Sequence, residues 1–180
     1  QLYPIFSKQL EEIKISKLFT KIEMPLLKVL AKMEIQGFRI DDKMLSDYAS
    51  TLSNEIEKIS KEIIKLSGEE FNIASPKQLG EVLFEKMDLV KKAKKTKSGQ
   101  YSTSEETLLK LKDKHPIIEQ ILEYREIKKL LSTYIIALPE LINQNTKRIH
   151  TTFNQSVAAT GRLSSINPNL QNIRIRTARG

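Results

Sequence analysis

Two long stretches with a helical spacing of apolar residues constrain the fold of this chain most strongly. The first ends at Gly68, and its apolar residues recur every three or four positions: Leu45, Tyr48, Leu52, Ile56, Ile59, Ile63 and Leu66. Pro116 opens the second, which ends near Pro139 and has the apolar residues Ile117, Ile121, Tyr124, Ile127, Leu130 and Tyr134. Each stripe predicts an amphipathic helix that must bury its apolar face. We therefore expect a mainly α protein in which the two long helices pair antiparallel, with a small helical tip between them.

Shorter helices are expected before this pair and within the tip. Apolar spacing predicts a helix from Lys17 to Ile35, which Pro25 bends or delays and Gly37 stops. Capping patterns predict one short helix over residues 75–84 and another that begins near Ser104.

The composition changes after Pro139, where Asn, Thr, Ser, Gln and Arg dominate. Short β-prone pieces at residues 148–153 and 173–175 predict strands. These strands have too few partners within the chain for a complete sheet, so we expect them to form the edge of an incomplete one.

Composition excludes several classes of protein. With 39% hydrophobic, 29% charged and 6% aromatic residues the chain is too apolar to be disordered, and it is too rich in Glu, Lys, Leu and Ile to suggest a sandwich or barrel. The absence of cysteine excludes disulfides, thiolate zinc sites and iron–sulfur clusters, and two histidines far apart disfavour a histidine-rich metal site.

The sequence also suggests a location. No apolar run approaches the ~18 residues of a membrane span, and the N-terminus lacks the order of a secretory signal. We therefore expect a cytoplasmic protein with no membrane partner. Because the chain begins at Gln1 and stops in mid-pattern at Gly180, we also expect it to be a piece of a longer protein.

The net charge of +8 is concentrated in two segments. Residues 141–180 contain six basic residues and no acidic one. Five more cations lie close together in the expected tip: Lys91, Lys92, Lys94, Lys95 and Lys97. Such localisation predicts a polyanionic partner, because each neutralised phosphate releases condensed counterions. For the lysine run alone, a solvated loop without a partner stays an open alternative.

Several motifs near the C-terminus carry a resemblance. They are Thr152-Phe153-Asn154-Gln155, then Ala159-Thr160-Gly161-Arg162-Leu163-Ser164-Ser165, then Pro168-Asn169-Leu170-Gln171-Asn172-Ile173. Together they resemble the beginning of the palm of family A DNA polymerases, the bacterial DNA polymerase I type. Earlier segments continue the resemblance through the thumb of that family: Phe19 to Asp41, Phe71-Asn72, Ser75 to Leu79, Ser102-Thr103-Ser104, Tyr124-Arg125 and Ser132-Thr133-Tyr134.

The resemblance implies a division of the chain into three parts. Residues 1–18 resemble the end of a preceding exonuclease-type domain. Residues 19–140 resemble the thumb, with a DNA-contacting tip at about 68–104, and residues 141–180 resemble the start of the palm.

The resemblance also implies a set of DNA-binding residues. It assigns phosphate contacts to the tip and to Arg176, and minor-groove and primer contacts to the C-terminal motifs. The full set is Lys91, Lys92, Lys94, Lys95, Lys97, Ser102, Thr103, Ser104, Asn154, Gln155, Thr160, Arg162, Ser164, Asn169, Gln171, Asn172 and Arg176.

A physical reason for the minor-groove contacts is independent of the family. Every base pair offers an acceptor there at nearly the same place, so Arg, Asn and Gln donors can hold a correctly paired duplex without reading its sequence. Arg162, Asn169, Gln171 and Asn172 provide such donors, although polar loop residues also commonly satisfy their own backbone. One departure from the family is Arg174, which stands where proline is usual; whether it adds a phosphate contact or loosens the turn stays open.

Catalytic groups are not expected in this chain. The family's reaction needs two palm aspartates that hold two metal ions, and fingers that bind the nucleotide, all beyond Gly180. The chain's own aspartates are expected to cap helices or to lie on the surface: Asp41, Asp42, Asp47, Asp88 and Asp113. We expect Mg²⁺ to act only in the complete polymerase, and this chain to bind primer-template duplex DNA without catalysing a reaction.

The expected partners are primer-template DNA and the remaining palm and fingers of the parent polymerase. We expect that polymerase to act in DNA replication and repair, and we expect a monomer. One alternative is a non-enzymatic helical nucleic-acid-binding module, and another is a helical adapter for protein partners. The two acid-free basic segments disfavour the adapter. The motifs from Arg162 to Asn172 favour the polymerase over the non-enzymatic module.

Overall fold

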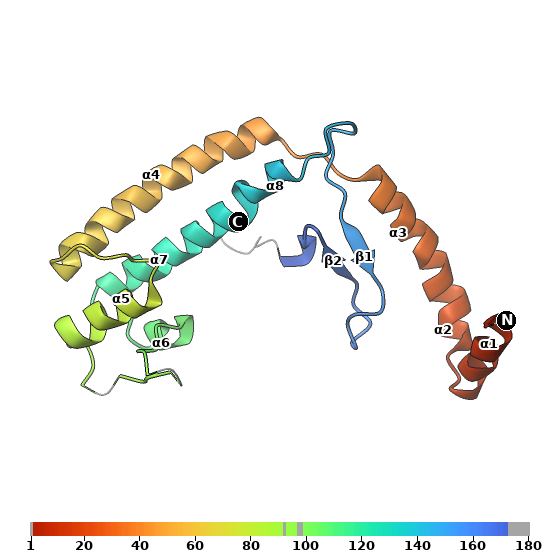
Figure 1. Cartoon of the computed structure of the whole chain (residues 1–180), viewed down its shortest axis with the longest axis horizontal. Helices are drawn as coiled ribbons and strands as arrows, with labels where there is room; N and C mark the ends of the chain where they lie inside the picture. The colour runs from red at the N-terminus through yellow and green to blue at the C-terminus, as the bar shows by residue number, and fades with distance from the viewer. Residues whose placement is uncertain (1, 92, 97–98, 173–180) are drawn as a thin grey trace. The chain divides into compact units, whose positions relative to one another are not determined.

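The structure, a computed structural model, describes residues 2–91, 93–96 and 99–172. Its contacts divide the chain into two compact units, Asp42–Ala137 and a second unit made of Gln1–Asp41 with Leu138–Gly180. Figure 1 shows the elements of both.

The unit Asp42–Ala137 is built on the two expected long helices. Helix α4 (Asp42–Ser67) packs along α7 (Ile117–Leu130) and its π-helical continuation η3 (Leu131–Ile135). The two run antiparallel in Figure 1. Their apolar stripes meet in the core, where Ile63, Ile121 and Ile127 are fully buried. The prediction of a mainly α fold with two paired long helices is confirmed.

A small helical tip lies between the long helices in sequence. It contains α5 (Pro76–Glu81), the π-helical η2 (Val82–Lys86) and α6 (Glu105–Leu109). The side chain of Ser75 accepts a hydrogen bond from the amide of Gln78 and caps α5, and Ser104 caps α6 in the same way. Buried Leu79, Leu83 and Leu108 join the tip to the core of the long helices.

The second unit begins with helices: α1 (Tyr3–Glu12), α2 (Ser16–Leu18), the π-helical η1 (Phe19–Glu23) and α3 (Met24–Gln36). The irregularity expected at Pro25 takes the form of the π-helical turn η1 directly before α3, because proline lacks an amide donor and crowds the preceding turn. Gly37 ends α3, as expected, with φ +58° and ψ −172°.

The rest of this unit is short and mostly irregular. Helix α8 (Ala137–Glu140) leads into a segment that ends in β1 (Thr152–Asn154), β2 (Ser164–Ile166) and the 3-10 turn η4 (Leu170–Asn172). The strands pair antiparallel, with Phe153 opposite Ser165.

The strand predictions were only partly correct. Of the expected strand at 148–153, only the last two residues belong to β1, while Arg148 and Ile149 form isolated bridges with Asn143 and Phe38. The expected strand at 173–175 lies outside the described residues. The actual partner of β1 is β2, whose sequence Ser-Ser-Ile has little β propensity.

The expected thumb, residues 19–140, includes parts of both compact units, because residues 19–41 belong to the same unit as residues 138–180. The division into an exonuclease-type end, a thumb and a palm start therefore stays a prediction.

Candidate nucleic-acid interface

The tip loop, which we define as residues 87–104 between η2 and α6, presents the lysine run. Backbone hydrogen bonds shape it: the amide of Ser102 donates to the carbonyl of Lys94 at 2.8 Å, and that of Thr96 to the carbonyl of Gln100 at 2.6 Å. The side chains of Lys91, Lys94 and Lys95 are exposed. Lys92 and Lys97 lie outside the described residues. The described lysines are therefore accessible to a phosphate.

The hydroxyl residues at the end of the tip loop serve mainly within the protein. Thr103 is only 6% exposed, its Oγ1 accepts a hydrogen bond from Arg125 Nη2 at 3.1 Å, and its carbonyl accepts another from Arg125 Nη1. Ser104 Oγ caps α6, and Ser102 Oγ lies 3.1 Å from Thr107 Oγ1. Of these three hydroxyls, that of Thr103 is therefore the least accessible to DNA.

Arg125 joins helix α7 to the tip loop, a role that its motif did not predict. Burial lowers the pKa of Arg125, and the nearby Glu105 carboxylate opposes that shift. The guanidinium nevertheless stays charged at physiological pH, because the ordinary pKa of arginine lies far above neutrality. A charged donor with two hydrogen bonds to one residue is strong and directional. Arg125 therefore fixes the end of the tip loop, where the chain enters α6.

The β1–β2 hairpin presents the second group of predicted residues. Asn154 lies on β1, half-buried and opposite Ser164 on β2. Ser164 Oγ is buried without a hydrogen-bond partner among the described residues. In the connecting loop, Thr160 and Arg162 are exposed on either side of Gly161, which has φ +73°. The side chain of Arg162 is thus exposed at the end of the hairpin loop.

The turn that follows β2 is held by its own side chains. Ser165, fully buried, accepts a hydrogen bond from the amide of Leu170 at 3.0 Å. Asn169 Oδ1 accepts one from the amide of Gln171 at 3.1 Å, and Gln171 Nε2 donates to the carbonyl of Leu163, the residue after Arg162. One of the two hydrogens on Gln171 Nε2 is therefore engaged within the protein, and the other can donate to a further acceptor.

Two further predicted residues in this region cannot be placed fully. Asn172 lies in η4, but its side chain is not among those described. Arg176, like Arg174, lies outside the described residues.

Two glutamates of the N-terminal helices hold the hairpin, and sequence reasoning missed both. Glu34 Oε1 accepts a hydrogen bond from the amide of Phe153 at 2.6 Å. Glu23 Oε2 accepts one from Gln155 Nε2 at 2.7 Å, so the amide of Gln155 is already engaged. Nothing in a single sequence distinguishes such glutamates from solvated surface charges. The pairs that they form are 119 and 132 positions apart.

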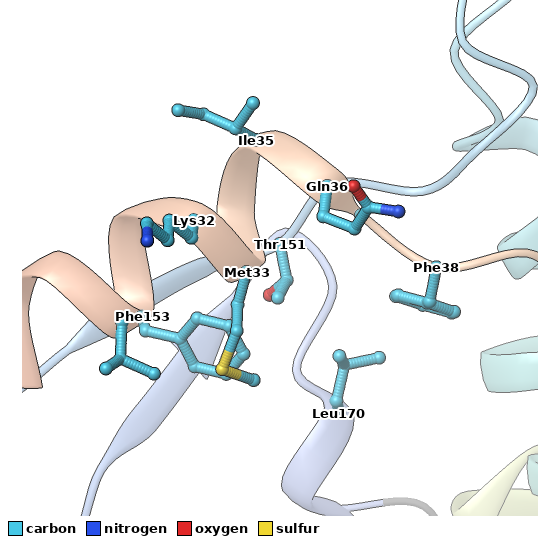
Figure 2. A pocket seen from close by; sticks show the side chains of 10 residues that line it. Lys32, Met33, Ile35, Gln36, Phe38, Thr151, Phe153 and Leu170 are labelled. Atoms are coloured by element: carbon cyan, nitrogen blue, oxygen red, sulfur yellow. The ribbon is translucent and has the colours of Figure 1, made fainter.

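A hollow of about 780 Å³ lies between α3 and the hairpin (Figure 2). Figure 2 shows Met33 and Phe153 side by side in its lining, with Phe38 and Leu170 further along. Its lining is almost entirely apolar, and Lys32 supplies its only charged group. No carboxylate or imidazole is among the described residues that line this hollow.

Metal chemistry is not supported by the side chains that can be placed. Across residues 2–91, 93–96 and 99–172, no three His, Asp or Glu residues come together in a way that could hold a metal ion. These residues do not fit a two-metal site, and no catalytic step can be derived through one.

No helix in the described part of the chain is long and apolar enough to cross a membrane.

Comparison with known proteins decides the family. The sequence profile described as "DNA polymerase family A" matches residues 42–180. The chain belongs to this family. DNA polymerase I of a Synechocystis species is 51% identical over 172 residues, which cover 94% of this chain and 17% of the relative. DNA polymerase I of Geobacillus stearothermophilus is 48% identical over 164 residues, covering 91% of this chain and 18% of the relative.

A solved polymerase structure is similar in fold over nearly the whole of this chain. The POL domain of Pol1 from M. smegmatis, in complex with DNA primer-template and dNTP, matches 96% of this chain with a TM-score of 0.83 and 39% identity. The match covers 30% of that domain. The resemblance stated from the motifs is thus confirmed, and the chain spans less than a fifth of these two curated polymerases.

Proposed function

We propose that this chain is the duplex-gripping part of a DNA-directed DNA polymerase of replication and repair. In this proposal residues 19–140 form the thumb, residues 141–180 begin the palm and residues 1–18 end a preceding exonuclease-type domain. The single observation that supports it best is the likeness, over nearly the whole chain, to a polymerase domain described in complex with primer-template DNA.

The exposed cations support a backbone contact at the tip. Lys91, Lys94 and Lys95 project from one loop, and such a group attracts phosphates whatever the base sequence. The proposal assigns Lys92, Lys97 and Arg176 the same role.

The hairpin supports a minor-groove contact. Arg162 is exposed, and the amide nitrogen of exposed Asn169 is not used in the bond that its Oδ1 accepts. Both can donate to the acceptors that all base pairs share. We propose the same surface for Asn154, Thr160 and Asn172, and we propose that Ser164, whose Oγ is buried, supports this surface from within β2.

Three predicted contact residues act in this proposal mainly from within the protein. Thr103, Gln155 and Gln171 each have a hydrogen bond to another part of the chain. They shape the surfaces that carry the lysines and Arg162.

In this proposal the rest of the parent polymerase catalyses nucleotide incorporation. The missing palm and fingers would supply the carboxylates that bind Mg²⁺ and the groups that bind the nucleotide. We propose that the chain itself is monomeric and cytoplasmic, and that it contacts the remaining palm and fingers.

Fluorescence anisotropy on two labelled primer-template duplexes of equal length and unrelated sequence tests the proposal. We expect similar affinities for both duplexes and a linear fall of log affinity with log salt concentration. Replacing Lys94 and Lys95 together by alanine should flatten that slope by up to about 1.8, since each phosphate contact contributes about 0.9.

The matched control removes two cations elsewhere in the same unit. Lys58 and Lys61 lie exposed on α4, and their joint replacement by alanine makes the same change in net charge. We expect it to leave the slope nearly unchanged. Equal effects of the two double variants, or a strong preference for one duplex sequence, would contradict the proposed interface.

A further inference from the structure

Tyr101 occupies an unusual place within the tip loop. The Lys95 Nζ lies 4.6 Å from the centroid of the Tyr101 ring, which is within the range of a cation–π contact. On the protein side, the ring lies 5.3 Å from that of Phe84, centroid to centroid, at 43°. Tyr101 thus stands between the core of the tip and an exposed cation.

Backbone structure brings the lysine and the ring together. Lys95 and Tyr101 face each other in an antiparallel bridge. The hydrogen bonds from Ser102 to Lys94 and from Thr96 to Gln100 lie on either side of it. Because residues opposite each other in such a bridge have neighbouring side chains, the contact follows from the register of the loop.

Gly80 makes room for Tyr101 on helix α5. A Cβ atom at position 80 would lie 2.9 Å from the Cβ of Tyr101, closer than real Cβ contacts allow. Phe84 follows one helical turn later and offers its ring to the same side chain. The position of Tyr101 is therefore determined by two residues of the tip core.

We propose that Tyr101 is a positioning residue that holds the Lys95 ammonium ready for a phosphate of the duplex backbone. This inference rests on the proposed function. An exposed lysine samples many rotamers, and ordering it on binding costs affinity. A ring that already restricts the ammonium removes part of that cost, while the exposed side of Lys95 stays open to a phosphate.

Binding of the duplex by the 180-residue chain and its variants tests the proposal. Tyr101→Leu should weaken binding at low salt by roughly three- to tenfold, the equivalent of one immobilised long side chain. Tyr101→Phe keeps the ring and should bind within about twofold of the unmodified chain. Phe84→Leu disturbs the same packing from below without removing the ring from Lys95, and we expect a smaller effect than that of Tyr101→Leu.

A double-mutant cycle separates positioning from direct contact. If Tyr101 acts through Lys95, adding Tyr101→Leu to Lys95→Ala should cause no further loss. Additive losses would overturn the proposal, since Tyr101 would then contact DNA itself. Equal losses in Phe84→Leu and Tyr101→Leu would overturn it as well, since the effect would come from packing alone.

A spectroscopic measurement of the free chain is independent of DNA. Because protons over an aromatic face resonate upfield, the Lys95 Hε signals should lie upfield of those of Lys58 and should lose this shift in Tyr101→Leu. Absence of the shift in the unmodified chain would overturn the positioning role alone. A chain that shows the shift but binds no duplex would overturn the proposed function, and with it the role of the contact in phosphate binding.

Discussion

The exchange of Gly37 for alanine should loosen the join between α3 and the segment that leads to the β1–β2 hairpin. Gly37 has φ +58° and ψ −172°, a region that is nearly exclusive to glycine. An added Cβ would lie 2.6 Å from the carbonyl oxygen of Ile149 and 2.8 Å from His150 Nδ1. The nearest obstacle is a backbone atom, so the two segments would have to separate.

The expected cost follows from these contacts. Phe38 and Ile149 exchange two backbone hydrogen bonds of 3.0 and 2.9 Å. Losing both costs about 2 kcal/mol, and the strained backbone adds about 1–3 kcal/mol. We therefore expect Gly37→Ala to lower the local free energy of opening by about 3–5 kcal/mol.

Gly68 provides the matched control. It also has a positive φ of +76°, but no atom lies within 4 Å of the position that its Cβ would take. Gly68→Ala should cost only about 1–2 kcal/mol from the left-handed backbone.

Hydrogen exchange measured by NMR compares the two variants. In Gly37→Ala the amides of Phe38 and Ile149 should lose most of their protection, while the amides of α7 keep theirs. If Gly37→Ala and Gly68→Ala changed protection near their own sites by the same amount, the steric argument would be refuted.

Three other predictions concern the interface. Arg125→Leu should destabilise the tip by about 1–3 kcal/mol, because it leaves the buried polar groups of Thr103 unpaired. Urea unfolding measures this loss of stability. An unchanged unfolding midpoint would refute the structural role of Arg125. The hydrogen bond from Lys110 lowers the pKa of Glu106, so this carboxylate is ionised at neutral pH. Glu106→Gln should therefore raise duplex affinity roughly twofold at low salt, because phosphates near Lys94 are repelled less. Anisotropy titrations should show that this gain vanishes at high salt. In the parent polymerase, Arg162→Ala should slow single-turnover incorporation far more than it weakens duplex binding, because the substitution impairs the alignment of the primer end. A loss of binding alone would refute the minor-groove role.

Much of the unit Asp42–Ala137 could be predicted from sequence because its determinants are local. The apolar stripe of α4 and the positive-φ stop at Gly68 involve residues within a few positions of each other. The same is true of the caps at Ser75 and Ser104. Two long amphipathic helices in one chain bury their apolar faces most simply against each other, so the sequence predicted the pairing of α4 with α7.

The exposure of Lys91, Lys94 and Lys95 was also predictable. Five lysines within seven positions cannot be buried together, because an unpaired buried charge is too costly. The contact of the Lys95 ammonium with an aromatic ring could not be predicted. The ring of Tyr101 reaches Lys95 only because Gly80, on a separate helix, leaves room for it.

The hairpin and its supports were decided by tertiary structure. Ser164 and Ser165 carry no strand signal, and β2 exists because Thr151 and β1 offer it partners: Thr151 Oγ1 lies 3.0 Å from the carbonyl oxygen of Ile166. Glu34 bonds to an amide 119 positions away, and no spacing rule connects two such sites. Local sequence determined the helices of the unit Asp42–Ala137 and the exposed charges of its tip loop. Hydrogen bonds between distant residues, visible only once the chain is folded, determined which polar side chains are engaged within the protein.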